Sequence, residues 1–439
     1  MGQVKDVGKF LFWVAKWATR GLLALVAVAA IVWSIMLFAG SMRLQEALEA
    51  VRSEPKLMNP APKNWDIGGP GDNGGPYFAA AFALHRYWVH EIGLPVQKVL
   101  QEGWAAISEE QQAKIRSWLE SKKSAFDLAA EGARRPWCRF VRSWTSNPWE
   151  IYAPEIGGVA FLGRSLILRA EMQSADGDPA GARESIRLAF AVADTLRDEP
   201  PRECLSFRMG LHEQIMTSLL RLIPSEVTVQ DCDEWRRLLP DLSTYNGLLE
   251  RAYLWDLHVL VDVLSGPLDR FWHAWAEANH RVGRGSGFQR RLADPWVKID
   301  GVRALEELQR MIGVIGKPYP EAHAELRKMW SEWHNRSRSW NPVRAVFVIP
   351  ASWHLDCVQS NRALSTLLHT GLDWERTRIE TGKYPDRCET VDPFTGQALV
   401  LEEGPRRLTS GGAKGWSLES QGGGVTVRGR PLSWVLRGK

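Results

Sequence analysis

The side chains most able to do chemistry in this sequence are its ten histidines, and their spacing forms no recognisable catalytic pattern. The His-Glu pair at 212–213 is not followed by a second histidine four residues on, so the zinc-binding H-E-x-x-H helix is absent. His85 and His90 are five residues apart, which places them about 140° apart around a helix. His354 and Cys357 could share a helix face, but two ligands do not complete a zinc site of four. We therefore predict no metal site and no cofactor.

Other catalytic signatures are also missing from the sequence. The glycine-rich stretch 283–287 lacks the spacing of a serine nucleophile elbow, and no phosphate-binding Walker loop is present. Neighbouring carboxylates stand where helix starts or exposed surfaces normally carry them, at 109–110, 231–233 and 402–403. The five cysteines contain no C-x-x-C pair and form no disulfide framework. We predict that the protein is not an enzyme, and we keep an envelope enzyme built from scattered residues as an alternative.

The strongest structural signal is the run from Gly21 to Met42, which contains no charged residue. At 1.5 Å per residue it forms a helix of about 33 Å, enough to cross a hydrocarbon core of about 30 Å. A cleaved signal peptide is one alternative, because residues 39–41 are as small as those of a processing site. A buried helix of a soluble protein is another. We predict a transmembrane helix over 21–42, since the apolar run is longer than the usual signal core.

Charged residues on the two sides of this run predict its orientation. Residues 1–20 carry four basic residues and one acidic residue, whereas the far side mixes both signs. The positive-inside rule then makes 1–20 a cytoplasmic basic arm, and it places the body outside the cytoplasm of a bacterial inner membrane. Amphipathic aromatic rings and basic side chains favour the headgroup level of a lipid bilayer. The predicted membrane-interface residues are Trp13, Lys16, Trp17 and Arg20.

The charge balance argues against nucleic acid as a partner. The whole chain has a formal charge of +4, and the arm contributes +3 of it (four basic minus one acidic), which leaves +1 for the rest. Nucleic-acid-binding domains usually carry a strongly basic surface. One basic stretch, 281–303, contains several glycines and is predicted as a flexible connection; a contact with anionic lipid or an acidic partner is the alternative.

Turn residues and helical periodicity divide the remainder of the chain. Residues 43–76 are predicted as a linker, because 53–76 are rich in Pro, Gly, Asn and Asp. Residues 77–380 carry amphipathic helical patterns, which predict an extracytoplasmic α-helical bundle or a solenoid-like array. A capping box is expected at Ser108 and another helix start at Thr228. The sequence Gly177-Asp178-Pro179 can end one helix and begin the next, which predicts an antiparallel hairpin.

The pattern changes after residue 380 to short alternating runs separated by Gly and Pro. These runs predict a small β-rich tail over residues 381–439. The fold class expected for the whole chain is therefore mainly α, with an N-terminal transmembrane helix, a helical body and this β-rich tail.

Short motifs in the body and the tail resemble those of a group of uncharacterised bacterial single-pass membrane-anchored helical proteins. The matching tail pieces are Gly382-Lys383-Tyr384-Pro385, then Asp392-Pro393-Phe394-Thr395-Gly396 with Leu399, and Trp416-Ser417-Leu418-Glu419-Ser420. The same tail is similar to the C-terminal region of type II secretion pseudopilins, where acidic residues near the end can hold Ca²⁺. Here Gln421-Gly-Gly-Gly-Val-Thr-Val follows Ser420 without those acids, and the pilin-type processing site is absent.

Tryptophan is unusually abundant, with 22 residues. Because tryptophan is enriched at protein interfaces, the rings clustered late in the body are candidate partner contacts. The alternative is an aromatic-rich core. The candidate contacts are Trp272, Trp275, Trp330, Trp333 and Trp340.

Together these patterns favour a membrane-anchored extracytoplasmic scaffold or accessory subunit of a membrane or envelope protein complex. Its expected partners are membrane lipid and another protein. A pseudopilin-like component of an export or envelope machine is the second hypothesis, and the envelope enzyme is the third.

Overall fold

The structure is a computed structural model of the full chain. It describes residues 2–54, 72–85, 96–140, 155–199, 201–223, 227–268, 272, 287–336, 343–344, 351–385, 387–402, 407–409 and 433–435. The described part is mainly helical, as the sequence predicts.

The chain divides into two compact units, and the division differs from the predicted single body over 77–380. Unit 1 contains residues 1–59, 257–310 and 333–349, and unit 2 contains residues 60–256, 311–332 and 350–439. The N-terminal helix therefore shares a unit with segments from the middle of the chain. Amphipathic patterns locate helices but do not say which of them pack together, so the sequence did not reveal this division.

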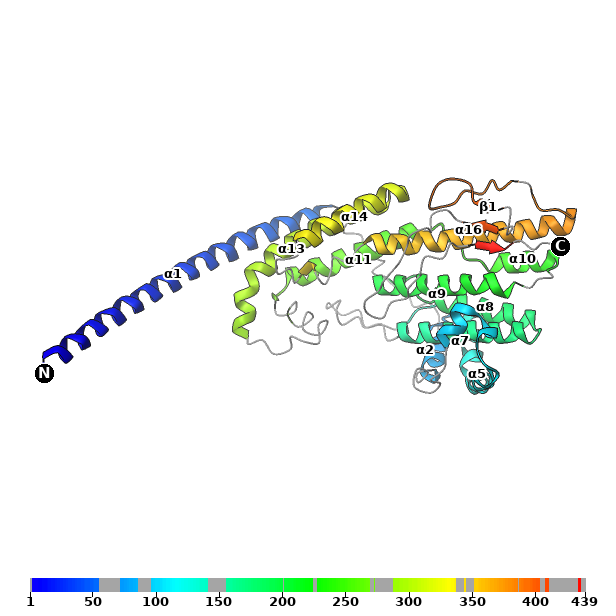
Figure 1. Ribbon diagram of the computed structural model, residues 1–439, viewed down its shortest axis with the longest axis horizontal. Helices are drawn as coiled ribbons and strands as arrows, with labels where there is room; N and C mark the ends of the chain where they lie inside the picture. Colours follow the sequence, from blue (N-terminus) through cyan, green and yellow to red (C-terminus); the bar gives the residue numbers. More distant parts are fainter. Residues whose placement is uncertain are drawn as a thin grey trace. The chain divides into compact units, whose positions relative to one another are not determined.

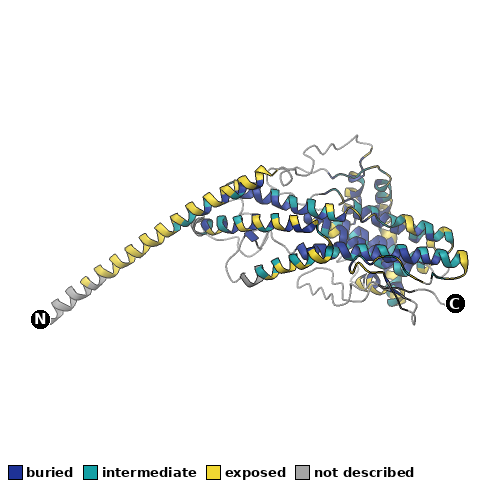
Figure 2. Cartoon of the chain, turned by 90° about the horizontal axis from the view of Figure 1, so that it is seen from above, coloured by how far each residue is buried: buried dark blue, intermediate teal, exposed yellow. Residues whose placement is uncertain are grey.

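Unit 1 is built on α1 (Gly2–Ser53), a single unbroken helix (Figure 1). Its apolar half is exposed, as at Leu22 and Phe38, whereas Leu44, Leu48 and Val51 near its C-terminal end are buried (Figure 2). These three residues recur at the four- and three-residue spacing of one helix face. Residues 43–53 therefore belong to the helix and not to the predicted linker, because this apolar stripe has a partner to pack against.

That partner includes α13 (Gly287–Ile315), which has Pro295 within it. A Cβ added at Gly40 of α1 would meet the Ile299 side chain at 3.4 Å, so the two helices approach closely there. Lys298 donates from Nζ to Ser41 Oγ at 2.7 Å. The prediction of a flexible connection over 281–303 is wrong from Gly287 onward, because these residues form helix packed on α1.

Two further contacts join distant segments within unit 1. Arg52 of α1 donates from Nη2 to Ser265 Oγ at 2.6 Å, at the end of α11 (Tyr245–Ser265). On α13, the Asp300 carboxylate accepts hydrogen bonds from Val343 N at 2.9 Å, Arg344 N at 3.1 Å and Arg344 Nε at 2.6 Å. Asp300 and Arg344 are both buried, so this pair fixes a distant segment of the chain to α13.

Unit 2 is a stack of packed helices. The long helices α7 and α8 pack against each other, and α9 contacts both of them and α16; α10 also packs on α16, and α2 packs on α6 and α7 (Figure 1). Its described helices are α2 (Gly75–Leu84), α4 (Val96–Glu102), the 3-10 helix η1 (Trp104–Ala106), α5 (Glu109–Ser121), α6 (Lys123–Ala133), α7 (Glu155–Ala175), α8 (Pro179–Asp194), α9 (Arg202–Leu222), α10 (Val229–Leu238) and α16 (Ala351–Thr381). Helices α11 and α14 (Tyr319–Arg336) also begin in this unit, which contains their residues up to 256 and 332.

The predicted helix boundaries in unit 2 are confirmed where the sequence carried a specific signal. Ser108 forms the expected capping box with Gln111 at the start of α5. Gly177 adopts a φ of +77°, which suits glycine at a helix end, and Asp178 accepts from Gly181 N at 2.9 Å to cap α8. The α7–α8 hairpin follows directly from this junction.

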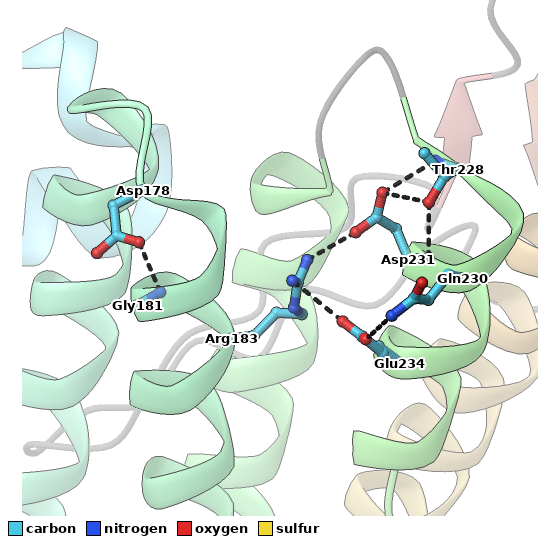
Figure 3. A network of polar contacts seen from close by, with 7 residues as sticks. All are labelled: Asp178, Gly181, Arg183, Thr228, Gln230, Asp231 and Glu234. Carbon is cyan, nitrogen blue, oxygen red and sulfur yellow. Dashed lines mark hydrogen bonds and ion pairs between the residues drawn. The ribbon is translucent and has the colours of Figure 1, made fainter.

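Figure 3 shows how the cap of α10 is linked to α8. The Thr228 hydroxyl accepts from Asp231 N at 3.1 Å, and the Asp231 carboxylate accepts from Thr228 N at 3.0 Å, which is a second capping box. Arg183 of α8 reaches Asp231 at 2.9 Å and Glu234 at 3.0 Å. One carboxylate therefore caps α10 and also ties it to α8.

Replacing Asp231 by alanine should lower the free energy of unfolding by about 1–2 kcal/mol, because the variant loses the carboxylate half of the capping box and one arm of the Arg183 ion pair. Urea unfolding followed by circular dichroism would measure the loss. Gln230→Ala is the matched control, since this exposed side chain donates only to Glu234 in the described part of the chain, and it should change stability by less than about 0.5 kcal/mol. Equal effects of the two substitutions would contradict the role given to Asp231.

Three short strands lie in the tail. They are β1 (Val400–Glu402), β2 (Arg407–Thr409) and β3 (Ser433–Val435), and they pair antiparallel in the order β1-β2-β3. The register sets Leu401 opposite Leu408 and Leu408 opposite Trp434. Because the stretches 403–406 and 410–432 lie outside the described residues, the prediction of a β-rich tail over 381–439 is not confirmed.

Candidate functional site

The tryptophans predicted as partner contacts do not form one described surface. Trp272 in unit 1 is only 5% exposed and donates from Nε1 to Asp294 Oδ1 at 3.2 Å, so its ring belongs to the core. Trp330 in unit 2 is half-buried. Trp275, Trp340 and the side chain of Trp333 lie outside the described residues. The core alternative is therefore the better description of Trp272.

The predicted membrane-interface residues all lie within about two turns of α1. Trp13 and Trp17 are 57% and 54% exposed, and their rings meet edge to face with centroids 6.1 Å apart. The Arg20 guanidinium lies 5.5 Å from the centre of the Trp17 ring, and Lys16 is exposed beside them. Rings and cations in this arrangement suit the headgroup level of a bilayer, because the rings are amphipathic and the cations can reach the polar layer.

Two histidines that the sequence analysis considered for chemistry lie in buried polar clusters of unit 2. In the first cluster, His212 of α9 is hydrogen-bonded through Nδ1 to Tyr245 Oη of α11 at 2.7 Å, and its Nε2 lies 3.3 Å from Asp194 Oδ1. Arg208 donates from Nε to the same carboxylate oxygen at 2.9 Å. Burial lowers the pKa of His212, which favours the neutral ring. Burial alone would raise the pKa of Asp194, but His212 and Arg208 hold it well below its usual range.

The second cluster repeats this arrangement eight residues further along α11. His354 of α16 is hydrogen-bonded through Nδ1 to Tyr253 Oη at 3.0 Å and through Nε2 to Ser206 Oγ at 2.9 Å. Arg202 of α9 lies over the Tyr253 ring, as Arg208 lies over the Tyr245 ring, and it forms an ion pair with Asp256. Burial raises the pKa of Asp256 to about 7, although Arg202 opposes the rise.

The proton positions in the second cluster decide whether His354 could act as a general base toward the Ser206 hydroxyl. The Ser206 hydroxyl donates to the Arg202 carbonyl oxygen at 2.9 Å, so it accepts a hydrogen bond from His354 Nε2–H. The Nδ1 atom of His354 then accepts from Tyr253. A general base must instead accept the proton of its nucleophile, so Ser206 and His354 do not form an activated pair in this arrangement. The two clusters join α8, α9, α11 and α16 through buried, paired groups.

Glu213, which follows His212 on α9, is a half-buried glutamate. Burial raises the pKa of Glu213 on α9 to about 7, and in the part of the chain that the structure describes no cation pairs with it. The Cys357 thiol of α16 lies near enough for Glu213 to add to the rise in the thiol pKa, which is due mainly to burial. A protonated thiol is a poor nucleophile, so Cys357 does not have the character of a reactive cysteine.

The tail motif Asp392-Pro393-Phe394-Thr395-Gly396 forms a tight turn that docks on the helices of unit 2. Asp392 organises the turn: its Oδ1 accepts from Phe394 N at 3.0 Å, and its carbonyl accepts from Gly396 N at 2.8 Å. Gly396 has a φ of +69°. The Phe394 ring packs edge to face on Tyr319, with centroids 5.6 Å apart, and Gln359 of α16 donates to the Pro393 carbonyl.

Tyr319 also belongs to a polar group next to the turn. Its hydroxyl donates to Asp356 Oδ1 at 3.0 Å, and His323 Nε2 lies 3.3 Å from the same oxygen. Burial raises the pKa of Asp356, against the effect of His323 and the Tyr319 hydrogen bond. These contacts fix the position of Tyr319 against both α16 and the turn.

A cavity of about 290 Å³ lies where this turn meets the helices of unit 2. Four separate segments line it: the start of α11, the junction between α13 and α14, one face of α16, and the turn itself. The turn motif can be identified in the sequence, but the cavity cannot, because no periodicity or spacing links residues that lie so far apart. Its polar lining residues include Asn246, Lys317, Tyr319, Gln359, Arg362 and Thr395.

Within the described part of the chain, no group of three or more His, Cys, Asp or Glu side chains could hold a metal ion. All five cysteines are free. No protein-family model matches the chain, and no curated protein or solved structure is similar to it.

Proposed function

We propose that this protein is a single-pass protein of a bacterial inner membrane, and that its extracytoplasmic helical body serves as a scaffold or accessory subunit of a membrane or envelope complex. The continuity of α1 carries the proposal. One helix has an exposed apolar half, long and apolar enough to cross a membrane by length and composition, and then a buried stripe within unit 1. A helix used in this way would hold unit 1 at the membrane surface, because the same helix spans the bilayer and packs in that unit.

A membrane anchor requires that the N-terminal helix is not cleaved from the mature protein. Gly40 and Ser41, which lie in the segment that resembles a processing site, contact α13. Cleavage near Ser41 would remove these contacts and cut the helix just before Leu44, Leu48 and Val51, which pack in unit 1. Intact-mass measurement of the purified protein should therefore give the full chain. A mature N-terminus near Met42 would overturn the proposed anchor.

Charges placed in the exposed apolar half of α1 test the membrane span. Val28→Arg combined with Val32→Arg should oppose insertion by about 5–7 kcal/mol, since a central arginine disfavours insertion by about 2.5–3.5 kcal/mol. We expect the variant to leave the membrane pellet during alkaline carbonate extraction. The matched pair Val28→Leu and Val32→Leu should stay in the pellet. An arginine pair that also stays would contradict a span centred here.

A scaffold should be found together with a partner protein, whereas an isolated membrane-anchored protein should not. Affinity purification of the full chain from native membranes in mild detergent should recover a stoichiometric membrane or envelope partner. A strictly monomeric, partner-free particle would count against the scaffold.

A pseudopilin-like component is the second candidate, and the same helix favours it. An exposed apolar helix half that continues into a packed half can be buried by lipid or by the same half of neighbouring copies. Cysteines introduced at Leu25 and Ile35 would distinguish the two environments. Disulfide-linked ladders of this chain in intact membranes would support assembly, and monomers under oxidising conditions would count against it.

A further inference from the structure

The cavity in unit 2 contains a cation for which the described part of the chain provides no counterion. Arg362 of α16 is half-buried and lines the cavity. Its closest described acceptors are two backbone carbonyls at long distances, Leu242 O at 3.5 Å from Nε and Ser243 O at 3.4 Å from Nη2. No carboxylate pairs with it among the residues that the structure describes. Burial lowers its pKa, which is the sign of a charge that has lost water without gaining an anion.

The second cation at the cavity differs in this respect. Lys317 Nζ lies 3.0 Å from Glu321 Oε1 and 2.8 Å from Glu325 Oε2, so two carboxylates outweigh its single positive charge. Neither glutamate lines the cavity, and the described lining residues include no acidic side chain. Among these lining residues, Arg362 is therefore the charged group that has no described carboxylate partner.

The shape and remaining lining of the cavity indicate the size and type of the anion. A cavity of about 290 Å³ lies near the lower end of small-molecule sites, which span about 300–1,000 Å³. Leu355 and the rings of Pro318, Pro320 and Pro393 provide apolar wall, which suits an organic group and not a bare ion. A guanidinium matches a carboxylate in geometry, because two parallel N–H groups can meet two oxygens.

We propose that this cavity binds a small organic monocarboxylate, with its carboxylate on Arg362 and its apolar part against Leu355 and the prolines. The turn formed by residues 392–396 closes one wall of the site, so the tail motif acts as a structural part of a ligand pocket. A single carboxylate matches the single cation without a carboxylate partner among the described lining residues, whereas a phosphate dianion would leave one charge uncompensated. The proposal does not depend on the scaffold function.

Isothermal titration of the full chain in detergent micelles tests the proposal, with benzoate as the probe. We expect saturable binding of benzoate and at least about tenfold weaker binding of benzamide, which has a similar shape but no charge. Inorganic phosphate should bind more weakly than benzoate. Equal binding of benzoate and benzamide, or no saturable benzoate binding at millimolar concentration, would overturn the proposal. Tighter binding of phosphate would overturn the carboxylate assignment.

Substitutions at Arg362 connect the binding to this site. Arg362→Gln should weaken benzoate binding at least about tenfold. The affinity of Arg362→Lys should lie between those of this variant and the native protein, because lysine keeps the positive charge but cannot donate two parallel hydrogen bonds to one carboxylate. Arg376→Gln is the matched control on the same helix, since Arg376 pairs with Asp233 and Glu380 and does not line the cavity. Unchanged affinity in Arg362→Gln would refute the site. The benzoate and benzamide comparison needs no variant, so it decides the proposal even where a substitution impairs folding.

Discussion

Replacing Asp300 by alanine is expected to lower the free energy of unfolding by about 3–5 kcal/mol, the range for removing one partner of a buried ion pair. The substitution leaves three donors without their acceptor: the Val343 and Arg344 backbone N–H groups and Arg344 Nε. The Arg344 guanidinium is 2% exposed in its side chain, so water cannot replace the lost carboxylate. Its remaining carboxylate partner, Glu307, is further away, at 3.3 Å.

Urea unfolding of the full chain in micelles, followed by tryptophan fluorescence, would measure this effect. Glu306→Ala is the matched control, because Glu306 is an exposed carboxylate on the same helix, and it should change stability by less than about 0.5 kcal/mol. The double variant Asp300→Leu with Arg344→Met should recover much of the loss, since it removes both charges together. A loss below about 1 kcal/mol for Asp300→Ala would show that the pair does not secure the 343–344 segment to α13.

Replacing Glu213 by glutamine is expected to stabilise the protein at pH 8 by up to about 3.5 kcal/mol and to have almost no effect at pH 4. Burial raises the pKa of Glu213 from its ordinary value near 4.5 to about 7, and one pKa unit corresponds to about 1.4 kcal/mol. Glutamine has nearly the same shape and carries no charge, so it removes the unfavourable ionisation and keeps the packing.

The sign of this pH dependence follows from proton binding. Between pH 4.5 and pH 7 the folded protein keeps the Glu213 proton while the unfolded chain releases it. The folded state therefore binds more protons, and the contribution of this group to stability falls as the pH rises through that window. The advantage of Glu213→Gln should grow over the same window and stay constant above about pH 8.

Unfolding curves of the two proteins at pH 4, 6 and 8 would check this prediction, because the other titrating groups are common to both and cancel in the difference. Glu120→Gln on α5, where the carboxylate is exposed, should leave the difference near zero at each pH. A destabilisation of Glu213→Gln at pH 8 would mean that the ionised carboxylate has a stabilising partner, and the assignment of an uncompensated buried acid would be wrong.

The sequence by itself determined the features that depend on neighbouring residues. The uncharged run from Gly21 to Met42 predicted the exposed apolar helix, because length and composition alone decide whether a segment can cross a bilayer. Ser108, Gly177 and Thr228 predicted helix boundaries correctly, since capping boxes and left-handed glycines act within about four residues. The mainly helical fold class followed from the same short-range periodicity.

Tertiary structure decided every feature that joins distant segments. It assigned α1 to a unit with residues 257–310, and it turned most of the predicted flexible stretch 281–303 into a helix packed on α1. It also placed His212 and His354 beside Tyr245 and Tyr253, which gave these histidines buried hydrogen-bond partners where sequence spacing had suggested only isolated rings. The cavity around Arg362, a cation with no carboxylate partner among the described residues, arises from four segments that no local pattern connects. Burial and the loss of water determine the charge behaviour of such groups, and both are properties of packing that local sequence signals do not specify.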